Sequence, residues 1–285
     1  MTDIKIGFIG QGWIGKHYAD NFEERGYNII RYDRHQYKEN LEQLLNCDIV
    51  FVAVPTPSTT SGFNDAILID AIRTSTRDGQ IIVIKSTIQV GTTDKIQELF
   101  PNRYIFHSPE FLTEKTAKYD AANPARNIVG YTERSRRFAQ NVMNVLPIAP
   151  YETIVPCKEA ELVKYGGNIW FYFKIMVINL IFDVAEYYDL DYEVIKDMLA
   201  ADKRIGRTHL DVFHQGGRGA GGDCFIKDLE AFREMYKKIN LNDVNHAKEG
   251  LSVLQDLANL NKKLLRNTGK SLDLLDGVYG KENNI

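Results

Sequence analysis

The first half of the chain alternates short apolar runs with amphipathic stretches. The apolar runs are rich in β-branched residues, have the length of strands, and occupy residues 4–10, 27–33, 47–54, 80–87, 103–109 and 126–131. The stretches between them repeat apolar residues at helical spacing, near residues 13–25, 37–46, 64–76, 91–100 and 133–145. Strands and helices that alternate in this way imply right-handed crossovers and a parallel sheet with helices on both faces. We therefore predict a Rossmann-like, doubly wound parallel sheet, the α/β class, over residues 1–155.

The pattern changes after Pro156. Helical periodicity predicts one long helix over residues 157–188, and shorter helices near residues 191–201, 224–238 and 242–266. A glycine-rich break, QGGRGAGGD at residues 215–223, interrupts this half, which shows no strand alternation. We predict an all-helical domain with a long central helix over residues 156–270. A polar tail at residues 271–285 is expected to fray.

The composition excludes several classes of protein. With 35 Lys and Arg against 38 Asp and Glu in 285 residues, the net charge of −3 argues against nucleic-acid binding. Three scattered cysteines, and six histidines without ligand spacing, argue against a disulfide framework and a metal site. The N-terminus lacks a basic flank and a cleavage site, and the most apolar stretch, residues 169–182, is shorter than the ~20 residues of a membrane span. We expect a cytoplasmic protein with no membrane segment, in which that stretch is a buried helix.

A glycine-rich turn follows the first predicted strand and opens a helix: Gly10-Gln11-Gly12-Trp13-Ile14-Gly15. Such a turn lets the backbone approach a pyrophosphate that sits on the helix N-terminus. Asp33 ends the second predicted strand, 23 residues after Gly10, where dinucleotide-binding proteins place the acid that binds the ribose hydroxyls. The segment predicts a dinucleotide cofactor, and Asp33 favours NAD over NADP, although Arg34 beside it could meet a 2′-phosphate.

Polar residues follow three further strands, and ligands bind at the carboxyl edge of a parallel sheet. Thr56 and Thr87 come after the third and fourth strands, where a hydroxyl can donate to a cofactor, a substrate or a water. Ordinary turn chemistry is the alternative. After the fifth strand, Glu110 and Glu114 are four residues apart, so on a short helix they would share one face directed at the crevice.

Lys164 and Asn168 are four apart in the predicted long helix and face the same way. The sequence around them is mostly apolar. A Lys and an Asn held together in a sheltered place can position and polarise an oxygen. A solvated helix face is the alternative.

The segment Gly219–Leu229 is the most informative part of the sequence. Glycines end a loop and Cys224 opens a helix, where unpaired N–H groups and the helix dipole stabilise a thiolate. Lys227 adds positive charge, and Asp228 lies on the face of Cys224. These partners favour a nucleophilic thiol, whereas Cys47 and Cys157 lack them and are interpreted as structural. A basic group just upstream could hold one phosphorylated ligand: Lys203, Arg204, Arg207 and Arg218.

Taken in order, these segments resemble the UDP-glucose/GDP-mannose dehydrogenase family, whose members use NAD to oxidise a nucleotide-sugar alcohol to an acid. The resemblance rests on GQGWIG, VAVPTP, KSTIQVGTT, SPEFLTE, NPARNIVG, AELVKYGGN, KRIG and GAGGDCFIKDL. These segments cover nearly the whole chain in sequential order. The final long helix is similar to the family's dimer-forming helix, so a homodimer is implied.

The resemblance also implies residue roles. Cys224 matches the family's catalytic thiol, and the polar group around it is matched by Lys164, Asn168 and Asp228. Thr87 and Glu110 match residues that handle the attacking water, while Thr56 and Glu114 lie with the cofactor. Substrate contacts are implied for Phe111, Leu112, Gly221, Gly222 and Lys227, and for Arg204, which in relatives reaches the substrate of a neighbouring subunit.

The chain departs from the family at several points. Asp223 stands where many relatives have Ser, and Ile226 where Pro or Gln is common. The family usually continues into a third, nucleotide-binding-like domain, which residues 270–285 cannot build. Nucleotide recognition is therefore expected to be weak, supplied by another chain, or directed at a different ligand.

The resemblance implies a four-electron oxidation. The sugar alcohol becomes an aldehyde, Cys224 captures it as a thiohemiacetal, a second oxidation gives a thioester, and water releases the acid. Two alternatives remain open at this stage. One is a two-electron β-hydroxyacid dehydrogenase, which shares the Lys and Asn spacing but uses no thiol. The other is a nucleotide-binding or dimerisation module without activity.

Overall fold

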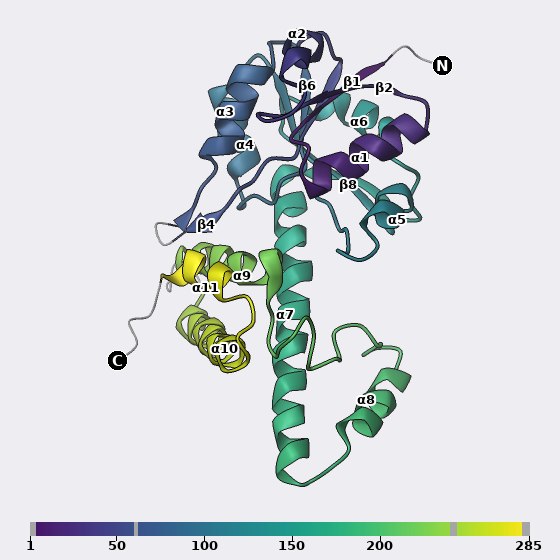
Figure 1. The fold of residues 1–285 in the computed structure, drawn as a ribbon. Coiled ribbons are helices and arrows are strands. Elements are labelled where there is room, and N and C mark those ends of the chain that lie inside the picture. Colours follow the sequence, from purple (N-terminus) through teal and green to yellow (C-terminus); the bar gives the residue numbers. More distant parts are fainter. Residues whose placement is uncertain (1–3, 60–61, 240–243, 281–285) are drawn as a thin grey trace. The chain divides into compact units, whose positions relative to one another are not determined.

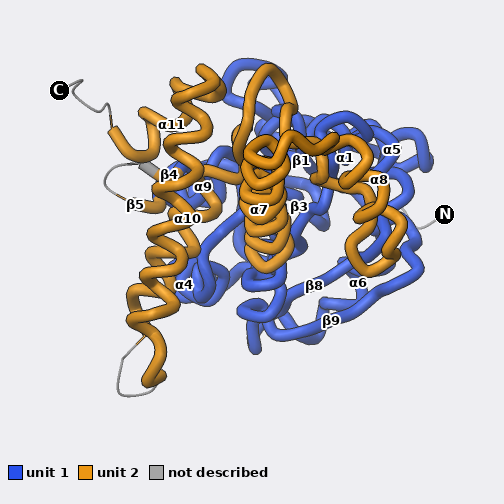
Figure 2. The backbone as a smooth tube through the Cα atoms, turned by 90° about the horizontal axis from the view of Figure 1, so that it is seen from below, with its two compact units in different colours: residues 1–57, 64–164 blue, residues 58–63, 165–285 orange. Residues whose placement is uncertain are grey.

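The computed structural model describes residues 4–59, 62–239 and 244–280. The chain divides into two compact units, residues 1–57 with 64–164 and residues 58–63 with 165–285 (Figure 2). We call them unit 1 and unit 2 and describe each by itself.

Unit 1 is built on a seven-stranded sheet with strand order β2-β1-β3-β6-β7-β8-β9. The strands are β1 (Lys5–Ile9), β2 (Asn28–Tyr32), β3 (Ile49–Val52), β6 (Ile81–Ile84), β7 (Tyr104–His107), β8 (Asn127–Tyr131) and β9 (Glu152–Pro156). Neighbouring strands pair in parallel, as expected for this fold class, except that β8 runs antiparallel to β7. The prediction of a wholly parallel sheet is wrong at that pair, because the connection after β7 carries a short helix that packs on α1 and brings the chain back in the opposite direction.

Helices cover both faces of the sheet in unit 1 (Figure 1). They are α1 (Trp13–Glu24), η1 (Lys38–Asn40), α2 (Leu41–Leu44), α3 (Ala66–Ser75), α4 (Thr92–Leu99), α5 (Ala117–Ala122), η2 (Arg136–Phe138) and α6 (Ala139–Val145). All except α5 fall within the predicted helical stretches. One core cluster joins α1 and α6 to the strands, and in it Phe8 packs on Phe22 and Phe51 with ring centroids 5.4 and 5.0 Å away.

Unit 2 is helical, as predicted, and contains most of α7 (Cys157–Tyr187), together with α8 (Tyr192–Ala201), α9 (Gly222–Lys237), α10 (Ala247–Thr268) and α11 (Leu272–Tyr279). A two-stranded hairpin, β4 (Ser58–Thr59) and β5 (Gly62–Phe63), also belongs to it. The Phe63 N–H donates to Glu234 Oε2 at 3.3 Å, and Ser58 Oγ donates to the Lys227 carbonyl at 3.3 Å. A segment from the N-terminal half of the sequence thus packs on α9.

The C-terminal residues differ from the expected frayed tail. Residues 272–279 form α11, and its Leu275 and Val278 are buried in a cluster with Ile226 and Leu265. Residues 281–285 of that tail, and residues 242–243 of the last long predicted helix, lie outside the described residues.

The long helix α7 is much less buried than expected. Its length and apolar composition would suffice for a membrane span, and no other helix of the described residues meets that criterion. Only 28% of its most apolar window is buried, so the prediction of a buried helix is wrong for most of that window. A single helix of this kind is weak evidence for a membrane segment.

Candidate active site

The first glycine-rich loop, residues 10–15, forms the predicted turn between β1 and α1. The Gly10 N–H donates to the Tyr32 carbonyl at 2.9 Å, and Gly10 has a φ of +88°. A Cβ atom on Gly15 would overlap the Gly10 carbonyl, whereas a Cβ atom on Gly12 would meet nothing within 4 Å. Gly15 is therefore needed for packing, while the open space at Gly12 suits the close approach of a ligand.

The start of α1 is suited to an anion. Gly12 caps the helix without a side-chain hydrogen bond, and no acidic residue occupies the first turn. The amides of that turn are therefore available to a pyrophosphate. The residues present fit the dinucleotide predicted from the sequence.

Asp33 lies beside this loop. The Gln11 N–H donates to Asp33 Oδ2 at 3.0 Å and the His35 N–H donates to Oδ1 at 2.9 Å. Partial burial raises the pKa of Asp33, but these backbone bonds outweigh it and hold the pKa below its usual value. The carboxylate is thus ionised and fixed, as a ribose acceptor must be. The neighbouring Arg34 pairs with Asp70 at 2.9 Å.

Polar residues gather at the carboxyl ends of β3, β6 and β7. Thr56 Oγ1 donates to the Thr87 carbonyl at 2.6 Å, so these two predicted residues lie together, both buried. Glu110 is also buried, and its Oε2 accepts the Leu112 N–H at 2.8 Å. Glu114 is exposed in a turn, and residues 108–113 form no helix. The prediction of a short helix with Glu110 and Glu114 on one face is therefore wrong.

Glu110 pairs with Lys164 inside unit 1. Lys164 Nζ donates to Glu110 Oε1 at 2.6 Å, and both side chains are almost fully buried. Phe111 lies beside the pair, with its ring centroid 5.8 Å from Lys164 Nζ, and Arg126 stacks on the same ring at 3.8 Å. A buried pair of this kind costs desolvation energy, so it points to a functional arrangement more than to a stabilising one.

Lys85 is a buried residue that sequence reasoning missed. Its Nζ donates to Ser108 Oγ at 3.3 Å and lies 4.2 Å from the centre of the Tyr18 ring. Burial lowers the pKa of Lys85 to about 7, with repulsion from Lys164 adding to the effect and attraction to Glu110 opposing it. The available signal was a lysine placed directly after a fully apolar strand.

A second polar cluster lies in unit 2. Asn168 Nδ2 donates to Asp228 Oδ2 at 2.5 Å, and Lys227 Nζ donates to Asp228 Oδ1 at 2.6 Å. Asp228 is buried, and both of its oxygens are engaged. The structure thus joins three of the predicted residues around one carboxylate.

Cys224 lies in the first turn of α9, one turn before Asp228, and is exposed. The other two cysteines are buried. Burial raises the pKa of Cys47 to about 11, and burial together with Glu161 and Asp94 raises the pKa of Cys157 further above its usual value. Of the three thiols, Cys224 is the one that a reagent or substrate can reach.

Three of the basic residues upstream of Cys224 each pair with a different carboxylate. Arg204 pairs with Asp202 at 2.6 Å, Arg207 with Asp197 at 2.6 Å, and Arg218 with Asp183 at 2.6 Å. The side chain of Arg204 is 90% exposed.

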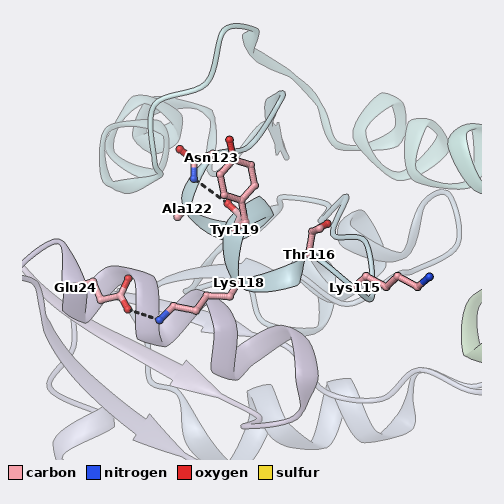
Figure 3. A pocket seen from close by; sticks show the side chains of 7 residues that line it. All are labelled: Glu24, Lys115, Thr116, Lys118, Tyr119, Ala122 and Asn123. Atoms are coloured by element: carbon pink, nitrogen blue, oxygen red, sulfur yellow. Dashed lines mark hydrogen bonds and ion pairs between the residues drawn. The ribbon is translucent and has the colours of Figure 1, made fainter. Parts of the chain in front are cut away.

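Two further features of the described residues bear on function. They contain no group of three His, Cys, Asp or Glu side chains that could hold a metal ion. A hollow of about 500 Å³ lies on unit 1 between α1 and α5, where Lys118 pairs with Glu24 at 2.9 Å (Figure 3). It is lined by Glu24, Lys115, Thr116, Lys118, Tyr119, Ala122 and Asn123, so none of the predicted site residues contributes to it.

Comparison with protein families assigns both halves of the chain. The NAD-binding domain of the UDP-glucose/GDP-mannose dehydrogenase family matches residues 34–146, and the central domain of the same family matches residues 158–262. The chain is 31% identical to UDP-glucose 6-dehydrogenase YwqF from Bacillus subtilis over 98% of its own length and 70% of YwqF. It is 31% identical to UDP-glucose 6-dehydrogenase from Pseudomonas aeruginosa, of which it covers 60%.

Solved structures share the fold. The UDP-D-ManNAc dehydrogenase from Pyrococcus horikoshii superposes with a TM-score of 0.77 at 20% identity, over 93% of this chain and 69% of that one. The 3-hydroxyisobutyrate dehydrogenase from Mycobacterium tuberculosis superposes with a TM-score of 0.69 at 17% identity, over 94% of this chain and 96% of that one. At these identities the likeness concerns the fold alone.

The fold and the first glycine-rich loop define a dehydrogenase of the dinucleotide-binding class. The family matches are more specific: the chain belongs to the UDP-glucose/GDP-mannose dehydrogenase family. Membership confirms the predictions of an oxidoreductase that acts on nucleotide sugars and of NAD as its cofactor.

Proposed function

We propose that this protein oxidises the primary alcohol of a nucleotide sugar to the carboxylate, through a thioester on Cys224. The observation that carries the proposal is the placement of Cys224 at the exposed start of α9, one turn from a buried carboxylate fixed by Asn168 and Lys227. UDP-glucose is the first substrate to consider, because several relatives are named for it.

NAD bound at residues 10–15 and Asp33 would accept one hydride in each of the two oxidations. The first oxidation removes a proton and a hydride from the alcohol and leaves an aldehyde. The Cys224 thiolate adds to the aldehyde carbon, and protonation of the oxygen gives a thiohemiacetal. The second oxidation removes a proton and a hydride and leaves a thioester. Water then attacks the thioester carbonyl, and the acid and the thiol are released.

The residues of the two polar clusters have the following roles in this proposal. Lys164 and Asn168 would stabilise the oxyanions that form along the reaction. Glu110 and Thr87 would position the hydrolytic water, and Asp228 would accept a proton. Thr56 and Glu114 would contact the cofactor. The substrate would be held by Phe111, Leu112, Gly221, Gly222 and Lys227, and by Arg204 of a neighbouring copy.

The test is to count NADH per substrate consumed with UDP-glucose, UDP-N-acetylmannosamine and GDP-mannose. Wild-type protein should form two NADH per acid. Cys224→Ser should lose acid formation by about 10³-fold or more, because no acyl intermediate can form. Cys47→Ala is the control, since that thiol is buried away from solvent. Undiminished acid formation by Cys224→Ser would refute the role of the thiol.

The same experiment distinguishes the proposed function from two others. A two-electron β-hydroxyacid dehydrogenase is the second candidate, because such enzymes share the spacing of Lys164 and Asn168. That function predicts one NADH per substrate and no effect of Cys224→Ser. NAD binding measured by calorimetry, with no turnover of any of these sugars, would instead support a binding module.

The resemblance implied a dimer through the last long helix, which is α10; we propose instead a homodimer that pairs through α7. Trp170, Val177 and Val184 recur every seven residues and are exposed, as are Leu180 and Tyr187. Side chains at this spacing share one face of a helix and suit a self-complementary contact with a second copy. A face covered in this way needs no membrane, which agrees with a cytoplasmic protein.

Light scattering tests the dimer. Wild-type protein should have twice the 32.6 kDa mass of the chain, and Val184→Glu should shift it to the monomer, because a buried unpaired carboxylate is costly. Leu99→Glu, which places the same charge at an exposed apolar position of α4 in unit 1, should leave the mass unchanged. A dimer that survives Val184→Glu together with Val177→Glu contradicts this interface.

A further inference from the structure

The loop that leads to Cys224 is held by side chains from one distant segment. The loop comprises residues 217–222, and the segment comprises residues 261–271 at the end of α10 and just after it. Four side chains of that segment bind the loop backbone: Asn261, Thr268, Lys270 and Ser271. We call this set the loop clamp.

Three members of the loop clamp hold N–H groups of the loop. Asn261 makes two bonds with Ala220, accepting its N–H at 2.7 Å and donating to its carbonyl at 3.0 Å. Thr268 Oγ1 accepts the Arg218 N–H at 3.1 Å. Ser271 Oγ accepts the N–H of Gly222, the first residue of α9, at 3.2 Å. The clamp therefore reaches the helix that carries Cys224.

Lys270 holds carbonyl groups of the same loop. Its Nζ donates to the Gly219 carbonyl at 2.8 Å and to the Gly217 carbonyl at 3.4 Å, and the side chain is 7% exposed. Burial lowers the pKa of Lys270 below its usual value. Within the described residues no carboxylate lies within 4 Å of its ammonium group. Peptide carbonyls alone compensate this buried cation, so their orientation depends on it.

Two glycines of the loop leave the space that the clamp side chains occupy. A Cβ atom on Gly217 would come within 2.5 Å of Thr268 Oγ1, and one on Gly221 would come within 2.6 Å of Ser271 Oγ and 2.8 Å of Lys270 Cε. Gly219 has a φ of +87°. Part of this glycine pattern is therefore required by the clamp itself.

The clamp lies largely beyond the part of the chain that the family's central domain matches. That match ends at residue 262, before Thr268, Lys270 and Ser271. The segment is nevertheless fixed in place, because the following helix α11 buries Leu275 and Val278 against Ile226 of α9. Figure 1 shows α11 beside α9.

We infer that Lys270 is a positioning residue for Cys224. Its ammonium group fixes the peptide planes of the loop, and the loop fixes the N-terminal amides of α9 that stabilise the Cys224 thiolate. The catalytic meaning of this inference rests on the proposed function. The prediction for the reactivity of the Cys224 thiol is independent of that function, since the reactivity can be measured without any turnover.

The test measures the rate constant for alkylation of Cys224 by iodoacetamide at pH 7, with the modified residue located by mass spectrometry. Lys270→Met should slow alkylation about 10-fold, because two buried carbonyls lose their donor and the loop relaxes. Lys270→Arg, which retains a cation and its donors, should restore most of the rate. Lys263→Met removes a charge from the exposed face of α10, the helix that ends just before Lys270, and should change nothing. NAD affinity, measured by calorimetry, should be the same in all four proteins.

An unchanged or faster alkylation rate in Lys270→Met, with a melting temperature near that of the wild type, would overturn the inference. If Lys270→Met does not fold, Ser271→Ala replaces it, since it removes a single bond to Gly222. It should slow alkylation about 3-fold, and an unchanged rate would count against the clamp. Slower alkylation in these variants, combined with undiminished acid formation by Cys224→Ser, would leave the clamp standing and reject the proposed function.

Discussion

Two glycine-rich loops precede the helices on which the proposed chemistry depends, and they are held in different ways. The loop at residues 10–15 is fixed by its own neighbours: the Gly10 N–H donates to the adjacent strand, and the Lys16 N–H donates to the Gly12 carbonyl. The loop at residues 217–222 is fixed by side chains that follow their partners by 41 to 53 positions, such as Asn261 and Lys270. The first loop is therefore encoded more locally, by contacts within residues 10–33, whereas the second depends on side chains at and after the end of α10.

The two units also hold a buried carboxylate in the same manner. In unit 1, Glu110 accepts from Lys164 and from the Leu112 N–H. In unit 2, Asp228 accepts from Lys227 and from Asn168. Each carboxylate thus has one cationic and one neutral donor, which fix its orientation. The two units thus differ in what supports their glycine-rich loops. They are alike in that each holds a buried carboxylate with one lysine and one neutral donor.

The largest expected effect comes from breaking the locally encoded loop. Gly15→Ala places a methyl group on the Gly10 carbonyl, which is backbone and cannot move aside. We expect the melting temperature of the protein to fall by about 5–10 °C, since overpacking of this kind costs about 1–3 kcal/mol and each kcal/mol lowers it by about 2–4 °C. Calorimetry should detect no NAD binding.

Gly12→Ala is the matched variant, because its methyl group meets nothing within 4 Å. It should leave the melting temperature within about 2 °C of the wild type and weaken NAD binding about 10-fold or more, since the methyl group occupies space that the pyrophosphate needs. Equal melting temperatures for the two variants would show that packing does not distinguish these glycines. Unchanged NAD affinity in Gly12→Ala would show that the cofactor does not bind at this loop.

The same contrast explains what the sequence could predict. Alternation of apolar residues located β1, β3 and β6 to within a few residues, and the pattern GQGWIG placed the first loop, because these signals are local. The direction of β8 was missed, since alternation does not encode strand direction. Residues 152–156, only partly buried, carried no strand signal and form β9.

Pairing of polar residues was the least predictable feature. Sequence spacing grouped Lys164 with Asn168, and Glu110 with Glu114, each four residues apart. The structure instead joins Lys164 to Glu110 and Asn168 to Asp228. These partners are 54 and 60 residues apart, so only the tertiary fold brings them together. The clamp on the Cys224 loop was missed for the same reason.

The smallest expected effect on NAD binding is that of Lys85, a buried lysine of unit 1. Lys270 binds the loop that it supports, whereas Lys85 donates to Ser108 and contacts α1 only through the Tyr18 ring. The comparison therefore predicts that Lys85→Met leaves NAD affinity unchanged. Its effect should appear in the stability of the protein, because burial lowers the pKa of Lys85 to about 7 from an ordinary value of 10.5.

The sign of the pH dependence follows from that lowered pKa. Between pH 7 and 10.5 the unfolded chain carries a proton on Lys85 that the folded protein has released, so the free energy of unfolding rises with pH. Below pH 7 both states hold the proton and the folded state bears the full cost of burying the charge. The methionine variant escapes this cost, so its stability relative to the wild type should be greatest at or below pH 7. That advantage should shrink by about 1.4 kcal/mol per pH unit as the pH rises from 7 towards 10.5.

Urea unfolding of both proteins at pH 7.5, 8.5 and 9.5 measures this difference. The lost hydrogen bond to Ser108 and the lost contact with Tyr18 add a constant to the comparison and leave its slope unchanged. Lys95→Met, in which the lysine is largely exposed, should show no such slope. A stability difference between Lys85→Met and wild type that stays constant over this range would mean that Lys85 keeps its proton when folded. Lys85 of unit 1 would then resemble Lys270 of unit 2 in charge. The two would still differ in their partners, since Lys85 binds Ser108 and Lys270 binds loop carbonyls.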